Sequence, residues 1–158
     1  MTSTPITDVL ALFARARSGV LCSAHAGHAG WPYGSIVPYA LTGAGDFVVF
    51  LSDIAEHTHN LQRDPRATLF VSDPDAADAP QAGARHAAMV RAERPPGAAA
   101  AELENAFFAR FPEAAAMRQS HGFAAWRLTV ERVRWIAGFG QMGWIDGGSW
   151  RAAAGRGA

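Results

Sequence analysis

The segment SDIAEHTHNLQRD, Ser52 to Asp64, concentrates polar side chains between two apolar runs. It carries two imidazoles, at His57 and His59, and two hydroxyls, at Ser52 and Thr58. Free N–H groups at a helix start, the helix dipole, a hydroxyl and an imidazole can together hold a phosphate. The segment therefore predicts an anion site where a helix meets the end of a strand.

A helix over this segment would use Ser52 as its N-cap. The face turned to the sheet would carry Ile54, His57, Thr58 and Leu61. His59 would then point to solvent. In the alternative interpretation, Asp53 and Glu56 only complement the helix dipole while His57 packs against the sheet. The residue types alone leave both interpretations open.

The histidines and the single cysteine do not form a recognisable metal or disulfide pattern. His57 and His59 are two residues apart, so on a helix they point about 200° apart and cannot share an ion. There is no H-E-x-x-H and no C-x-x-C pattern, and Cys22 is the only cysteine. We therefore expect no metal site and a reduced thiol in the core at Cys22.

The run GFGQMG, Gly138 to Gly143, matches the dinucleotide-binding G-x-G-x-x-G pattern. That fingerprint must open a helix inside a βαβ unit, with an acidic residue about 20 positions further on. Here WIDGGSW follows and the sequence soon ends. The run is better interpreted as a glycine-rich strand end that lets a ligand or a partner chain come close.

Composition excludes several function classes. All 14 basic residues are arginine, and the absence of lysine rules out Schiff-base chemistry on pyridoxal phosphate and a P-loop. The basic residues are balanced by 14 acidic ones without a basic cluster, so no nucleic acid or anionic membrane surface is expected as a partner. No signal peptide and no apolar run of about 20 residues is present, which predicts a cytoplasmic protein.

The surrounding pattern predicts a small β-rich domain. Ile6, Val9, Leu10 and Phe13 recur at helical spacing. Glycine-separated apolar runs then predict antiparallel strands, with a meander as the simplest topology. The expected strands are GVLCSAHA, SIVPYAL, FVVFL, RATLFV, RHAAMVRAE and FAAWRLTVERVRWIAGF. The expected helices are GAAAAELENAFFARF and PEAAAMRQ.

These elements favour a mainly β (α+β) fold, a small barrel of six to seven mostly antiparallel strands with peripheral helices. The segment DPDAADAPQAGA is expected to be an irregular loop. We expect a single domain over residues 1–150 and a disordered tail over residues 151–158. Five tryptophans in this short chain, three of them at Trp135, Trp144 and Trp150, favour a homodimer that covers aromatic surface.

The run from Pro32 to Val71 resembles the FMN-binding split-barrel family, the pyridoxamine 5′-phosphate oxidase-like proteins. It is most similar to the branch related to haem-utilisation proteins. The matching positions are Ser52, Asp53, Ala55, His57, Thr58, Asn60, Leu61, Asp64, Pro65 and Arg66. The C-terminal run RVRWIAGFGQMGWI is similar to the same branch, so the resemblance covers roughly Ile6 to Ile145.

The resemblance implies a homodimer with FMN at the subunit interface. It implies that the strand at Ser35 to Tyr39 lies along the flavin, that Leu51 to Asn60 surround the phosphate, and that the glycine turn and Trp144 come from the partner chain. The implied cofactor-binding residues are Ser35, Val37, Pro38, Tyr39, Leu51, Ser52, His57, Thr58, Asn60, Gly140, Gln141 and Trp144. No catalytic residue is implied.

Departures from the family pattern bear on the ligand. The oxidase proper places lysine and arginine on the phosphate, where this chain has Glu56 and His57, so FMN would be held by weaker donors. The oxidase's C-terminal substrate motif has no counterpart in GGSWRAAAGRGA, and haem-degrading relatives use a C-terminal histidine, whereas the last histidine here is His121. Two hypotheses follow: an FMN-dependent oxidoreductase acting on an unknown small molecule, or a protein that binds haem, another tetrapyrrole or flavin, either degrading haem or sensing the ligand without turnover.

Overall fold

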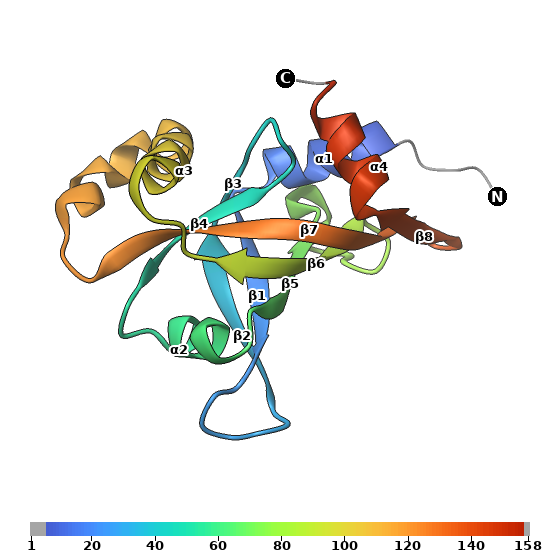
Figure 1. The fold of residues 1–158 in the computed structure, drawn as a ribbon. Helices are drawn as coiled ribbons and strands as arrows, with labels where there is room; N and C mark the ends of the chain where they lie inside the picture. Colours follow the sequence, from blue (N-terminus) through green and yellow to red (C-terminus); the bar gives the residue numbers. More distant parts are fainter. Residues whose placement is uncertain (1–5, 157–158) are drawn as a thin grey trace.

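The computed structural model describes residues 6–156, and in this range eight strands form one curled sheet (Figure 1). The strands are β1 (Ser18–Ala24), β2 (Pro32–Pro38), β3 (Ala40–Leu41), β4 (Phe47–Ser52), β5 (Arg66–Ser72), β6 (Arg85–Glu93), β7 (Phe123–Gly138) and β8 (Gln141–Asp146). Their spatial order is β2-β1-β5-β6-β7-β4-β3, with β8 paired to β7, and every pairing is antiparallel.

The described helices lie around this sheet. They are α1 (Ile6–Arg15), α2 (Glu56–Arg63), α3 (Gly97–Arg110) and α4 (Gly147–Ala154), with 3₁₀ segments η1 (Pro74–Ala76) and η2 (Pro112–Gln119). Figure 1 shows α1 and α4 side by side at one end of the sheet, α3 on a separate side, and α2 at the opposite end. The predicted fold class, a β-rich split barrel with peripheral helices, is confirmed.

Two details of the predicted sheet differ from the structure. In the described range there are eight strands rather than six or seven, because the run SIVPYAL is divided after Pro38 and because QMGWID forms β8. The meander is wrong for the first half of the sheet, since β4 pairs with β7 and β3 rather than with β2. Pro38 lacks the N–H that a continuous strand would need, so β2 and β3 separate there. Strand β2 is left as an edge strand.

The main core fills the concave side of the sheet. Phe13 of α1 packs on Phe47 and Trp150 with ring centroids 5.0 and 5.5 Å apart. The Trp150 indole N–H donates to the carbonyl of Gly45 at 2.7 Å, and Gly45 has φ +87°, a conformation that favours glycine. The first and last described helices are therefore joined through one aromatic cluster.

A second apolar cluster lies between β4, β7 and the α3–η2 region. The predicted stripe of α3 is confirmed: Leu103, Phe107 and Phe111 are all buried. Phe50 of β4 packs on this stripe, with its ring 5.8 Å from that of Phe107. Strand β4 therefore packs on apolar neighbours on both of its faces, as its continuous run FVVFL suggests.

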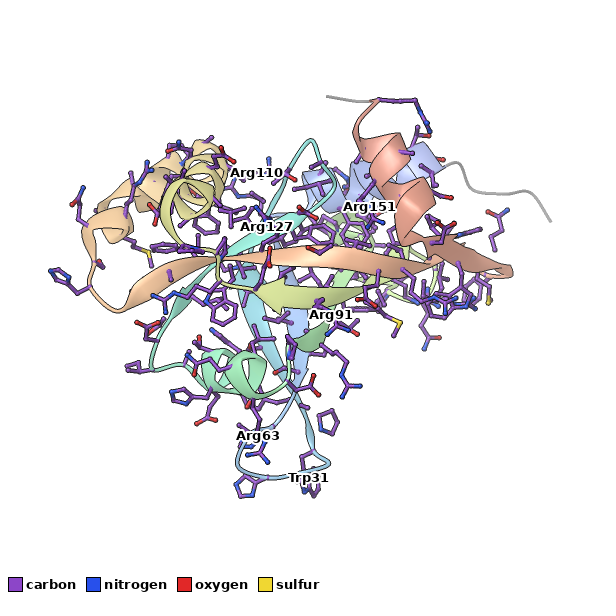
Figure 2. The ribbon with its side chains drawn as sticks, in the orientation of Figure 1. Trp31, Arg63, Arg91, Arg110, Arg127 and Arg151 are labelled. Carbon is purple, nitrogen blue, oxygen red and sulfur yellow. The ribbon has the colours of Figure 1, made fainter. Side chains whose placement is uncertain are left out.

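The predicted disordered tail, residues 151–158, starts too early, because its first four residues are helical. Arg151 to Ala154 belong to α4, which Asp146 caps by accepting the Ser149 N–H at 2.9 Å. Arg151, labelled in Figure 2, donates from Nη1 to the carbonyl of Val130 on β7. Burial of Trp150 and this hydrogen bond stabilise α4. The low-complexity sequence RAAAGRGA gave no indication of this helix. Residues 157–158 of the predicted tail lie outside the described range.

The tryptophans are distributed differently from the expectation. Trp135 and Trp150 are 7% and 0% exposed and pack within their own chain, whereas Trp144 is 50% exposed. Trp31, labelled in Figure 2 on the loop between β1 and β2, is 70% exposed. Trp31 and Trp144, rather than the three C-terminal tryptophans together, therefore present the aromatic surface that a partner chain could cover.

Candidate functional site

The polar segment after β4 begins as strand rather than helix. Ser52 pairs with Phe123 of β7, and the Asp53 N–H donates to the carbonyl of Gly122 at 2.7 Å. Helix α2 starts at Glu56, with Ala55 at its N-cap position and no side-chain cap. The predicted cap at Ser52 is therefore wrong, and so is the buried position of Ile54, which is 86% exposed. Pairing with β7 keeps the chain extended through Ser52.

Helix α2 is short and its ends agree with its charges. Glu56 lies in the first turn and Arg63 in the last, where both complement the helix dipole. The helix ends at Asp64 because Pro65 follows and disfavours helical geometry at the residue before it. The Asp64 carboxylate accepts hydrogen bonds from Arg66, which lowers the pKa of that carboxyl to about 2.

Thr58 and Asn60 tie α2 to the sheet. Thr58 is fully buried, and its hydroxyl donates to the carbonyl of Ser52 at 2.6 Å. Asn60 is also fully buried; its Oδ1 accepts the N–H of Ala26 at 2.8 Å and its Nδ2 donates to Ser23 Oγ at 3.0 Å. These two side chains hold the loop after β1 and the start of α2 in place.

His57 and Ser35 form the accessible polar pair of this region. The His57 Nδ1 and Ser35 Oγ atoms lie 3.0 Å apart, and both side chains are half-buried. Burial lowers the pKa of His57, so its imidazole is neutral around pH 7. With Nδ1 engaged by Ser35, Nε2 is the nitrogen left for a ligand. His59 is exposed, as predicted.

The other predicted contacts on β2 and β4 divide between core and surface. Val37, Tyr39 and Leu51 are buried, and the Tyr39 hydroxyl donates to the carbonyl of Phe13 at 2.6 Å. Ser52 is half-buried and Pro38 is exposed. Pro38 borders a groove of about 390 Å³ whose apolar lining includes Phe50, Phe107, Phe111 and Met117.

The glycine turn and Trp144 lie far from the His57–Ser35 pair within one chain. Gly140 has φ +77° and turns the chain between β7 and β8, and Trp144 lies on β8. Figure 1 shows β8 and α2 at opposite ends of the sheet. The GFGQMG run thus forms a β-hairpin turn, which confirms the rejection of a dinucleotide site. The structure therefore does not bring Gly140, Gln141 and Trp144 together with His57 within one chain.

The sequence interpretation missed a surface that we call the outer face, the convex side of the sheet. Cross-strand register places its central residues in two rows. One row is Ile36, Val20, Phe70, Ala87, Arg134 and Trp144, and the other is Gly34, Cys22, Thr68, Met89 and Arg132. Ile36, Phe70 and Met89 are 76%, 36% and 44% exposed. The alternation of residue types in β7 indicated that one face of this strand is polar. Which residues of the other strands lie beside that face depends on the register of five further strands.

A groove of about 570 Å³ crosses part of the outer face. Cys22, Thr68, Met89 and Trp31 line it. Cys22 is therefore a half-buried residue of this groove rather than a core thiol, and burial raises the pKa of its thiol. Among residues 6–156 no cluster of three or more histidine, cysteine or acidic side chains could hold a metal ion. In the same range no helix is long and apolar enough to cross a membrane.

Comparison with known proteins agrees with this architecture. The sequence profile of the family described as "CREG, beta-barrel" matches residues 11–152. The haem-binding protein of Mycobacterium smegmatis is 33% identical with a TM-score of 0.86; the match covers 96% of this chain and 62% of that one. This chain therefore spans less than two thirds of that relative. The comparison with curated proteins found no match.

Two more distant structures share the fold. HutZ, the haem storage protein of Vibrio cholerae, is 19% identical with a TM-score of 0.67, over 89% of this chain and 92% of its own. A candidate pyridoxamine 5′-phosphate oxidase of Listeria innocua is 16% identical with a TM-score of 0.62, over 84% of this chain and 98% of its own. These likenesses show a shared split-barrel fold. The chain belongs to the CREG β-barrel family.

Proposed function

We propose that this protein binds a planar conjugated cofactor and that a haem-type tetrapyrrole is the ligand its geometry supports best. The observation that carries the proposal is the His57–Ser35 pair: a neutral, half-buried imidazole whose Nδ1 is oriented by a hydroxyl. If Nδ1 carries the proton and donates to Ser35, the Nε2 lone pair is available to an iron atom. The M. smegmatis haem-binding relative supports the same ligand class.

FMN is the second candidate, and it would use the other tautomer of the same pair. If Ser35 donates to Nδ1, His57 presents an Nε2–H that can donate to a phosphate. The family resemblance favours this ligand and an oxidoreductase activity on an unknown small molecule. The arrangement disfavours it, because Thr58 and Asn60 are engaged elsewhere and Glu56 places a negative charge at the helix start.

A homodimer with the ligand between its subunits is part of the proposal. Gly140, Gln141 and Trp144 lie at the far end of the sheet from His57, so a shared ligand needs a second copy. The exposed apolar side chains of the outer face and the edge strand β2 are suitable surfaces for such a contact. Sedimentation of the purified protein tests it, and a stable monomer at micromolar concentration with ligand bound would contradict it.

Titration with haemin and with FMN distinguishes the two ligands. We expect a haem absorbance band that His57→Ala shifts and weakens, with a smaller effect of Ser35→Ala. His59→Ala is the matched control, because this exposed histidine lies two residues away on the same helix. Tight FMN binding that His57→Ala weakens far more than riboflavin binding would favour the flavin instead. Unchanged haem binding and spectrum in His57→Ala would show that the imidazole only packs.

A further inference from the structure

Two arginines lie together over one aromatic ring at the β7–β8 end of the outer face. The guanidinium carbons of Arg132 and Arg134 lie 4.3 and 5.5 Å from the centroid of the Trp144 ring. Arg134 and Trp144 are direct cross-strand partners. Both guanidinium groups therefore contact the same ring, and Trp144 is 50% exposed.

These two positive charges have no acidic partner among residues 6–156. Seven other arginines of that range form ion pairs with carboxylates: Arg15, Arg17, Arg66, Arg91, Arg94, Arg118 and Arg127. Asp146 is the cross-strand partner of Arg132, but both its oxygens accept from Ser149 at the start of α4. Glu131 pairs with Arg91. Two guanidinium groups without an ion pair, near the same aromatic ring, favour an anion.

The arginines border the groove of the outer face. Met89 is the cross-strand partner of Arg132, and the row continues through Thr68 to Cys22, all three of which line the groove. The row spans three strand spacings, about 14 Å. Trp31 forms the far side of the groove. Its volume of about 570 Å³ is in the range of small-molecule sites. The lining is mostly apolar and includes the Asp64–Arg66 ion pair, and Arg132 adjoins it beside Met89.

We propose that Arg132, Arg134 and Trp144 form a carboxylate clamp for a planar conjugated dicarboxylate whose rings lie along the outer-face groove. Each guanidinium can bind a carboxylate through two parallel N–H···O bonds, and the Trp144 ring supports the arginines that do so. The inference rests on the proposed function only for the choice of a tetrapyrrole. It assigns residues to the acidic edge of that ligand, which the neutral His57–Ser35 pair does not hold. Because Trp144 lies at the far end of the sheet from His57, a ligand that uses both would take the clamp from one copy and His57 from the other.

The test uses metal-free mesoporphyrin IX and its dimethyl ester, which have the same rings but differ in the carboxylates. Porphyrin fluorescence gives the affinity of the full chain and of Arg132→Gln, Arg134→Gln and the double variant. We expect each single change to weaken binding of the diacid by about 10- to 100-fold, the range for a lost hydrogen bond to a charged group. Binding of the ester should change little. The affinity of Arg132→Lys for the diacid should lie between those of the wild type and Arg132→Gln, because lysine keeps the positive charge but lacks the planar guanidinium that binds a carboxylate through two bonds.

Arg156→Gln is the matched control, because Arg156 is exposed, is near the end of α4 and has no carboxylate partner in the described range. Equal losses for diacid and ester would overturn the clamp, as would diacid binding that no arginine variant changes. Loss of both ligands together with altered sedimentation would assign the arginines to a contact between copies, and the clamp would be wrong.

His57→Ala separates the two proposals, because it should weaken binding of haemin but not of the metal-free porphyrin. Haemin binding that depends on His57 but not on the arginines would refute only the clamp, and no porphyrin binding at all would refute both.

Discussion

His86 should make the stability of this protein depend on pH below about 6.5. The side chain is 2% exposed on β6, its ring lies 5.7 Å from that of Phe13, and its Nδ1 has no hydrogen-bond partner. Burial lowers the pKa of His86, against a smaller opposing effect of a hydrogen bond with the Arg85 backbone. The folded state therefore binds this proton less readily than the unfolded state does.

The sign and size of the effect follow from proton linkage. A histidine whose pKa is depressed on folding contributes its full stability above its unfolded pKa of about 6.5. That contribution is lost as the pH falls from there toward the folded pKa, with a slope of up to about 1.4 kcal/mol per pH unit for one proton. The pKa values of the Asp64, Asp73 and Asp146 carboxyl groups are also lowered in the folded state. Their contributions to stability are lost only as the pH falls below about 3.9, so they do not overlap the range of about pH 5 to 6.5.

Urea unfolding of the wild type and of His86→Leu at several pH values measures the effect. The variant removes both the titration and an unsatisfied buried nitrogen, whose cost is about 1–3 kcal/mol. We expect it to be at least as stable as the wild type at pH 7 and to lose less stability toward pH 5. His57 contributes in the same direction, so the residual slope should decrease further in the double variant with His57→Ala. Parallel curves for wild type and His86→Leu between pH 5 and 6.5 would refute the reasoning.

Three further predictions concern positions that organise the site and the outer face. Asn60→Ala should reduce the free energy of unfolding by about 1–3 kcal/mol, because it leaves the Ala26 N–H unpaired, and amide exchange at Ala26 should speed up. Gly45→Ala should cost about 1–2 kcal/mol in chemical unfolding, since φ is +87° and the new Cβ would lie 3.0 Å from the Trp150 indole nitrogen. Alkylation of Cys22, which lies on the outer face, should slow at protein concentrations where sedimentation finds a dimer; equal rates at all concentrations would show that this face stays open.

Features set by neighbouring residues could be predicted from the sequence. Apolar spacing within single turns located α1 and the buried stripe of α3, and glycine punctuation located most strands. The context after Gly138 was enough to reject a dinucleotide fold, because the required helix must follow within a few residues. The polar segment after β4 was also correctly identified as the place where His57 meets the sheet. These signals are local, so they are present in the order of residues.

The tertiary structure alone decided what those residues do. Pairing of β4 with β7 moved the start of α2 to Glu56, and burial gave Thr58 and Asn60 hydrogen bonds within the chain. Packing of Trp150 on Phe13 formed α4 from a sequence without a clear helical pattern. The outer face joins residues from six strands that lie far apart in the chain. Its composition depends on cross-strand register, and register is determined by the packing of the whole sheet rather than by any one segment.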